Sequence, residues 1–258
     1  MPAHLMSAVF RRILPVLLTA VLFFIAGNAF PGDFRVTPIK LAFTANAKSG
    51  VITVINEGTA KMSLQISASE WTQDGKGKDV YTETADIVFY PKIMALEKGE
   101  QRVIRAGVKG PQPLREKTYR LFIEEIPERK KADEGKSQVS IVIRFAPPIF
   151  VRPLVESRSG SLEKVELAKG KLTVVVKNTG NVHATITAVT VQAKASDGRE
   201  VFAKDISGWY LLNGVSRPYE AAIPRDACLG ASTVEVTVKA DTFTLSRTVN
   251  VLKDMCKP

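Results

Sequence analysis

Strict alternation of apolar and polar residues is the feature that most constrains what this chain can fold into. From Met62 to Ser69 the apolar residues Met62, Leu64, Ile66 and Ala68 occupy every second position. Successive side chains of a strand point to opposite faces of the sheet, so this pattern predicts a strand with one buried and one solvated face. Similar segments recur along the chain, with almost no helical periodicity after the first thirty residues. We therefore expect an all-β protein.

The strands predicted in the first half are short and closely spaced. Glycine-containing turns separate them, for example the Asp-Gly-Lys-Gly sequence at 74–77. Seven short strands in about 120 residues are typical of an immunoglobulin-like β-sandwich. The predicted strands are Phe34–Phe43, Val51–Asn56, Met62–Ser69, Ile87–Tyr90, Arg102–Val108, Tyr119–Ile126 and Val139–Val151.

The second half again consists of short alternating segments separated by turns, which predicts a second sandwich. Its strands are expected at Leu162–Leu167, Leu172–Lys177, Thr185–Ala195, Glu200–Asp205, Val234–Ala240 and Phe243–Val251. A proline cannot donate to a strand ladder, so the Arg152-Pro153 pair marks the expected boundary. We predict two tandem immunoglobulin-like domains, residues 30–152 and 153–258.

The first 29 residues have the composition of a secretory signal peptide. Arg11 and Arg12 precede the apolar run Ile13–Ile25, and Gly27-Asn28-Ala29 fits a cleavage site with small residues. The alternative is an uncleaved membrane anchor, but the run is shorter than the ~20 residues that a span needs. We expect an exported protein with no stable membrane insertion after cleavage. Removal of the two arginines lowers the formal net charge from +10 to +8.

The charge and the cysteines fit an exported binding protein. An exported chain rarely meets nucleic acid, so its basic surface is better suited to acidic protein partners, and we expect no nucleic-acid partner. Export also places Cys228 and Cys256 in an oxidising compartment, which predicts one disulfide. A hairpin of the last two predicted strands pairs residues whose numbers sum to 483. The cysteines sum to 484, so they lie nearly opposite and one residue out of register.

The segment before the predicted boundary carries a long apolar row. Val139, Ile141, Ile143 and Phe145 share one face, and Pro147-Pro148 follows them. Prolines suit an edge strand, because they cannot donate to a neighbour. The pattern alone favours an ordinary half-buried strand. The alternative is an edge strand that lends its apolar row to a partner, since a long apolar edge is otherwise a liability.

Three groups of residues then follow one another in a characteristic order: Pro91 with Leu96–Gln101 and Arg105, Glu116 with Tyr119 and Glu125-Ile126-Pro127, and Phe150-Val151-Arg152-Pro153. Their order and spacing resemble the periplasmic pilus chaperones of the chaperone–usher pathway, the PapD-like family. The resemblance covers nearly the whole chain after the signal peptide. The pattern from Arg144 to Val151 is similar to the archaic branch of that family.

The resemblance implies a periplasmic chaperone that binds, folds and caps pilus subunits and hands them to an outer-membrane usher. A subunit is an incomplete immunoglobulin-like domain, and the chaperone lays its own edge strand into the open groove. Here that strand would present Val139, Ile141, Ile143 and Phe145. The family's two domains meet in a boomerang arrangement. No cofactor and no metal is implied.

The resemblance also implies a cleft in which basic residues bind the carboxylate of the subunit's C-terminus. The first basic position falls on Lys40, on the face of its strand opposite Ile39, Leu41 and Phe43. The second falls on Pro148, which carries no charge, so we expect Arg144, on the same strand face, to take its place.

The family further implies an ion network between the domains, and its positions fall on Glu116, Arg152 and Asp226. A lone surface charge at each position would contribute little to stability.

Two other function classes agree less well with the sequence. An enzyme is disfavoured, because His183 is the one histidine after the signal peptide and neither a nucleophile elbow nor a metal-ligand spacing occurs. A structural pilus subunit or adhesin is the alternative, since it is also exported and all-β. Such a subunit carries a flexible N-terminal extension and one incomplete domain, whereas this chain predicts two complete ones.

Overall fold

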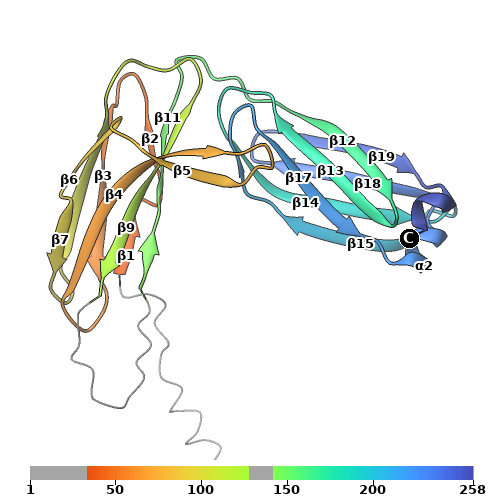
Figure 1. Ribbon diagram of the computed structural model, residues 1–258, viewed down its shortest axis with the longest axis horizontal. Helices are drawn as coiled ribbons and strands as arrows, with labels where there is room; N and C mark the ends of the chain where they lie inside the picture. The colour runs from red at the N-terminus through yellow and green to blue at the C-terminus, as the bar shows by residue number, and fades with distance from the viewer. Residues whose placement is uncertain (1–33, 128–141, 258) are drawn as a thin grey trace, which may run out of the picture.

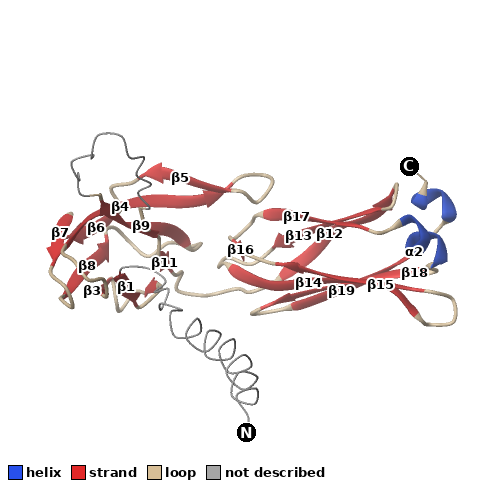
Figure 2. Cartoon of the chain, turned by 90° about the horizontal axis from the view of Figure 1, so that it is seen from below, coloured by secondary structure: helices blue, strands red, loops and turns tan. Residues whose placement is uncertain are grey.

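The computed structural model describes residues 34–127 and 142–257, and the segment predicted to be a signal peptide lies outside them. The prediction of an all-β protein is confirmed. The strands form two sandwiches in tandem, which meet at a bend (Figure 1), and the C-terminus lies at the far end of the second sandwich. The two sandwiches lie end to end when viewed from below (Figure 2). No helix in the described residues is long and apolar enough to cross a membrane.

The first sandwich packs a four-stranded sheet against a seven-stranded one. In the four-stranded sheet the order is β1 (Phe34–Thr37), β3 (Ser49–Asn56), β8 (Gln101–Val108) and β6 (Ile87–Tyr90). The larger sheet runs β2 (Leu41–Phe43), β11 (Pro148–Val151), β9 (Lys117–Ile126), β4 (Met62–Gln73) and β5 (Asp79–Glu83), with β10 (Arg144–Phe145) paired to β9 and β7 (Ile93–Leu96) paired to β4. The core lies between the sheets, where Leu64, Ile104 and Leu121 are fully buried.

The predicted strand Phe34–Phe43 is in fact two strands in different sheets. β1 pairs with β3, and β2 pairs in parallel with β11. The chain crosses from one sheet to the other at Pro38, which lies between them. Leu41 and Phe43 are buried as expected, but Ile39 is 75 % exposed because it lies in this crossing and not on a strand.

The second sandwich follows after residues 152–159. One sheet consists of β12 (Gly160–Ala168), β13 (Lys171–Asn178) and β17 (Ser216–Ala222). The other consists of β15 (Glu200–Ser207), β14 (Ala184–Lys194), β18 (Thr233–Ala240) and β19 (Thr244–Asn250), with β16 (Tyr210–Leu211) paired to β14. β16 and β17 were not predicted. β16 is only two residues long, and Pro218 and the polar residues of β17 obscure its alternation.

The last hairpin and the disulfide agree with the sequence. Val234 pairs with Val249, as predicted from the buried faces. Cys228 lies in the short helix α2 (Arg225–Gly230) and Cys256 in the 3-10 turn η1 (Lys253–Cys256), which absorb the one-residue offset. The predicted disulfide is confirmed, with the two Cα atoms 5.7 Å apart.

Removing the disulfide should lower the stability of the second sandwich. The bond closes a loop with a sequence separation of 28 residues. Loop-closure entropy for such a loop corresponds to about 3–4 kcal/mol of unfolding free energy. We expect urea unfolding of the double variant Cys228→Ser/Cys256→Ser to show an unfolding free energy that is lower by this amount. A loss below about 1 kcal/mol would show that the bond does not constrain the unfolded chain.

A hydroxyl–carboxylate contact ties the two sheets of the first sandwich together. The buried Tyr119 donates its hydroxyl to Asp86 Oδ2 at 2.7 Å, and the Lys117 ammonium donates to the same oxygen at 3.0 Å. These two donors, the tyrosine first, hold the pKa of Asp86 below its usual range. Burial and the neighbouring carboxylate raise the pKa of Tyr119, which stays protonated.

This contact predicts an acid-dependent loss of stability. A carboxylate whose pKa is depressed in the folded state stabilises the fold above its unfolded pKa, about 4, and this contribution disappears as pH falls through the lower folded pKa. We expect Asp86→Asn to unfold at lower urea concentration than the parent at pH 7, with the difference shrinking below about pH 3. An equal difference at both pH values would contradict the assignment.

Candidate functional site

The strand before the domain junction runs along β9 in one continuous register. Arg144 lies opposite Glu124 in β10, and Pro148 lies opposite Arg120 in β11, so the offset is unchanged across the interruption. Within the interruption Leu121 N–H donates to the carbonyl of Pro147 at 3.1 Å. The prolines therefore remove ladder donors without shifting the strand.

The other side of this strand is only partly covered. β2 pairs with residues 149–151, and within the described residues β10 pairs with β9 alone. Glu125 N–H donates to the carbonyl of Ile143 at 3.1 Å. Backbone groups alternate in direction along an antiparallel strand, so those of Arg144 face away from β9. Among the described residues, the segment 142–147 is thus an open strand edge.

The apolar row on this edge is not sealed inside the sandwich. Ile143 is partly buried against the core, and Phe145 is 37 % exposed with its ring 5.1 Å from that of Phe34. Val142, on the opposite face, is 43 % exposed. The other two predicted members, Val139 and Ile141, lie outside the described residues.

The two cations predicted to act together are not side by side. Arg144 lies over the ring of Phe122 at 3.9 Å, with its Nε 3.4 Å from Glu124. Lys40 is exposed, and the parallel register of β2 with β11, extended by one residue, places it beside Pro148. Four residues of strand, roughly 13 Å, separate Pro148 from Arg144. The structure therefore does not bring Arg144 to Lys40.

A different arginine lies on the other side of Pro148, and the sequence analysis missed it. Arg120 is directly opposite Pro148 and is only 6 % exposed. Its guanidinium lies 3.8 Å from the ring centre of Trp71, and Nη1 donates to the carbonyl of Ala146 at 2.8 Å. Its Nε–H is buried without a hydrogen-bond partner, and burial lowers the pKa of the group. The only signal in the sequence is that Arg120 alternates with core residues in β9.

The two sandwiches share a small apolar core beside this arginine. Trp71 and Phe150 from the first sandwich pack with Leu212 from the second, and all three are buried. Gln73 accepts a hydrogen bond from the N–H of Leu212 at 2.9 Å, while its own amide donates to the carbonyl of Tyr210 at 2.9 Å. These contacts fix the seven-stranded sheet of the first sandwich against the second sandwich.

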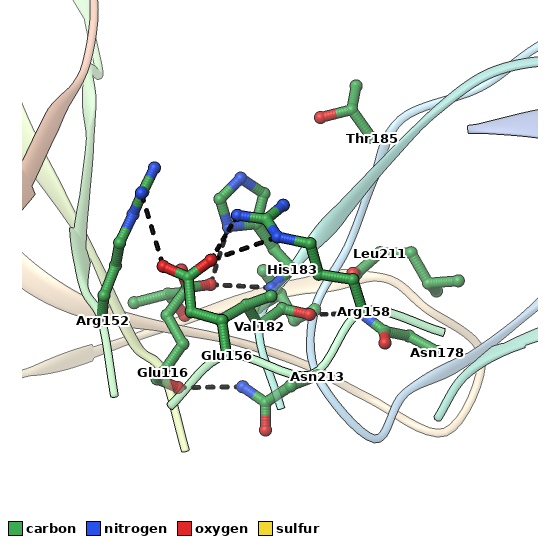
Figure 3. A network of polar contacts seen from close by, with 12 residues as sticks. Glu116, Arg152, Glu156, Arg158, Asn178, Val182, His183, Thr185, Leu211 and Asn213 are labelled. Atoms are coloured by element: carbon green, nitrogen blue, oxygen red, sulfur yellow. Dashed lines mark hydrogen bonds and ion pairs between the residues drawn. The ribbon is translucent and has the colours of Figure 1, made fainter. Parts of the chain in front are cut away.

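A buried carboxylate completes the junction. Glu116 Oε1 accepts from the backbone N–H of His183 at 2.9 Å and contacts the imidazole Nδ1 at 2.7 Å (Figure 3). The imidazole stacks on Phe150, with ring centres 3.8 Å apart. Asn213 donates to the backbone carbonyl of Glu116 at 2.8 Å. His183 thus has a structural role between the two sandwiches.

This arrangement differs from the predicted ion network. Arg152 pairs with Glu156 at 3.4 Å, four residues along its own segment, and not with Glu116 (Figure 3). Asp226 lies in α2, at the far end of the second sandwich (Figure 1). Of the three predicted members, only Glu116 bridges the sandwiches, and its partners could not be read from spacing because they are 67 and 97 residues away.

Residues 33–155 match the family model described as the pili and flagellar-assembly chaperone, PapD N-terminal domain. The first sandwich, which these residues cover, therefore belongs to the PapD-like family of pilus-assembly chaperones. Proteins of this family are not enzymes, in agreement with the sequence analysis.

Curated relatives and solved structures point the same way. The chain is 26 % identical over 135 residues to the chaperone protein LpfB of Salmonella typhimurium. The aligned region covers 52 % of this chain but only 55 % of LpfB. The chain is 24 % identical over 176 residues to the probable fimbrial chaperone EcpE of Escherichia coli K12, covering 67 % of this chain and 73 % of that one.

The fold resembles that of a chain in the CsuC–CsuE chaperone–tip adhesion subunit pre-assembly complex from the archaic Csu pili of Acinetobacter baumannii. The TM-score is 0.58 at 20 % identity, covering 84 % of this chain and 98 % of that one. It also resembles the CupB2 chaperone of Pseudomonas aeruginosa, with a TM-score of 0.51 at 16 % identity, covering 84 % and 100 %. At these identities the likeness supports the two-domain fold.

Proposed function

We propose that this PapD-like chaperone binds and caps pilus subunits with the open strand edge at 142–147. The observation that carries the proposal is an apolar edge strand that no other described strand covers. A long apolar edge invites association, and a protein keeps one only where a partner uses it. The family that the first sandwich matches implies the kind of partner, which is an incomplete immunoglobulin-like domain.

Donor-strand complementation supplies the binding energy in this proposal. The outward backbone groups of Arg144 extend the partner's ladder, while Ile143 and Phe145, with Val139 and Ile141 ahead of them, fill its groove. Burying one such side chain contributes roughly 1.5–3 kcal/mol. Four such residues contribute roughly 6–12 kcal/mol before the costs of association and ordering are subtracted.

The carboxylate anchor in this proposal is Lys40 together with Arg120. The two cations flank Pro148, the position at which the family's second basic residue falls. The side chain of Lys40 makes no hydrogen bond or ion pair with the described residues, and Arg120 holds a buried donor without an acceptor. Arg144, the residue expected from the sequence, would act as a second contact further along the strand.

Location and delivery complete the proposal. Chaperones of this family work in the periplasm, and the segment 1–29 would direct export as a cleaved signal peptide. Transfer of the subunit to an outer-membrane usher follows from the family. The alternative of a structural subunit or adhesin is not favoured, because the relatives and structural neighbours are chaperones.

Co-expression tests the function directly. The chain is produced with small exported β-proteins encoded beside its gene, and the products are separated by size-exclusion chromatography. A chaperone gives a soluble complex of one chain with one subunit, while the subunit alone aggregates or polymerises. A chain that polymerises by itself and captures none of these proteins would contradict the proposal.

The anchor predicts a matched effect on chain and partner. Lys40→Ala should weaken capture of a subunit by about tenfold, as expected for loss of a charge-assisted hydrogen bond. The same substitution should have no effect on a subunit whose C-terminal carboxylate is converted to an amide. Lys98→Ala, an exposed lysine on the β7–β8 turn, is the control. Equal weakening for both forms of the subunit would show that Lys40 does not contact the carboxylate.

A further inference from the structure

A second open strand edge lies on the other sheet of the first sandwich. β6 is the last strand of the four-stranded sheet and pairs only with β8 among the described strands. It runs along the side of the domain turned away from the second sandwich (Figure 1). Lys109 N–H donates to the carbonyl of Asp86 at 2.8 Å, so alternation directs the backbone groups of Val88 toward β8. Those of Ile87 and Phe89 therefore face the free side.

A hollow of about 490 Å³ opens on the outer face of this edge. It exists because Gly107 has no side chain and lies in register between Ser49 and Val88. Its walls include Val88, which is 50 % exposed, and Tyr90, which is 76 % exposed, with Arg105 opposite Tyr90. Exposed apolar side chains around a hollow are typical of an interaction surface.

A second hollow, of about 570 Å³, opens on the other side of the same strand, between the two sheets. Ile66 and Ala68 of β4 line it together with Phe89. The lining also includes Lys92 and Lys109. Both hollows share Val88 and Phe89. A strand added to β6 would point its side chains alternately into one hollow and the other.

The charges around the edge select the partner. The side chains of Arg105, Lys92 and Lys109 make no hydrogen bond or salt bridge with the described residues. Glu83 is the one acidic residue lining either hollow, and the nearby Asp86 is already bound by Tyr119 and Lys117. A second copy of this basic chain is a poor occupant, because like charges in contact are repulsive.

We propose that β6 is a second strand-docking edge, which takes an extended acidic segment of a partner protein. Apolar residues of that segment would enter the hollow between the sheets, and the alternating acidic residues would lie over Arg105. Main-chain hydrogen bonds to Ile87 and Phe89 supply the ladder. This site does not depend on the donor edge, since β10 belongs to the other sheet.

A short blocked peptide of alternating valine and glutamate tests the proposal on the purified full chain. Amide hydrogen exchange should slow at Ile87 and Phe89 when the peptide binds, and exchange at Arg144 should not change. Arg105→Glu/Lys92→Glu should weaken binding about tenfold or more, and added salt should weaken it further. The control Lys204→Glu/Lys239→Glu carries the same charge change on exposed lysines of the second sandwich and should bind as the parent does.

Three results would overturn the proposal: no peptide binding at millimolar concentration, equal binding of a valine–lysine peptide, or protection at Arg144 in place of β6. Each of them leaves the donor-strand function intact, because subunit capture is measured separately.

Discussion

Replacing Ile143 and Phe145 with aspartate should abolish capture of a pilus subunit while the chain stays folded. Each substitution removes an apolar contact of roughly 1.5–3 kcal/mol and puts a charge into the partner's groove. We expect affinity to fall more than a hundredfold, equivalent to about 2.7 kcal/mol or more. The measurement is recovery of the one-to-one complex from co-expression, followed by titration of the purified components.

The matched control is Val142→Asp, which places the same charge one residue away on the opposite face of the strand. It should leave capture within about threefold of the parent. Because Ile143 packs partly on the core, the single variant Phe145→Asp is included, since its side chain is more exposed. Equal loss in the control, or undiminished capture by the double variant, would contradict the proposed role of this face.

The second large effect is expected at the junction of the sandwiches. Glu116→Ala leaves the N–H of His183 without its acceptor in a buried site. An unsatisfied buried donor, together with a lost hydrogen bond to a charged group, costs about 2–3 kcal/mol. We expect the unfolding free energy measured in urea to fall by the same amount. Small-angle X-ray scattering should show a wider spread of interdomain angles.

The control for this prediction is Glu163→Ala. The carboxylate of Glu163 accepts hydrogen bonds from the side chains of Lys177 and Ser216, but it lies at the surface within the second sandwich. Its removal should cost less than about 1 kcal/mol and leave the scattering curve unchanged. A Glu116 variant that matches this control would show that the carboxylate does not hold the two sandwiches together.

Much of the fold could be predicted because alternation and burial obey local rules. The buried faces of β18 and β19 gave the register that pairs Val234 with Val249, and two cysteines in an exported chain gave the disulfide. The break at Pro38 was missed, because apolar residues continue on both sides of it. β17 was missed because Pro218 and its charged neighbours interrupt the alternation.

The site was harder to predict because its contacts join the two sandwiches. Trp71 packs with Leu212 of the second sandwich, and Arg120 lies over the Trp71 ring, so the burial of both involves a contact that the local pattern does not contain. The same holds for Glu116, whose partner is a histidine 67 residues away. The apolar row at Ile143 and Phe145 was predicted, because it depends only on the local pattern.

Amide hydrogen exchange at Arg144 tests the central claim most directly, in the free chain and in its purified complex with a subunit. The backbone N–H of Arg144 faces the open edge, so it should exchange quickly in the free chain and at least about a hundredfold more slowly when a partner strand accepts it. Unchanged exchange at Arg144 in an intact complex would show that the subunit binds elsewhere and that this edge is not lent to it.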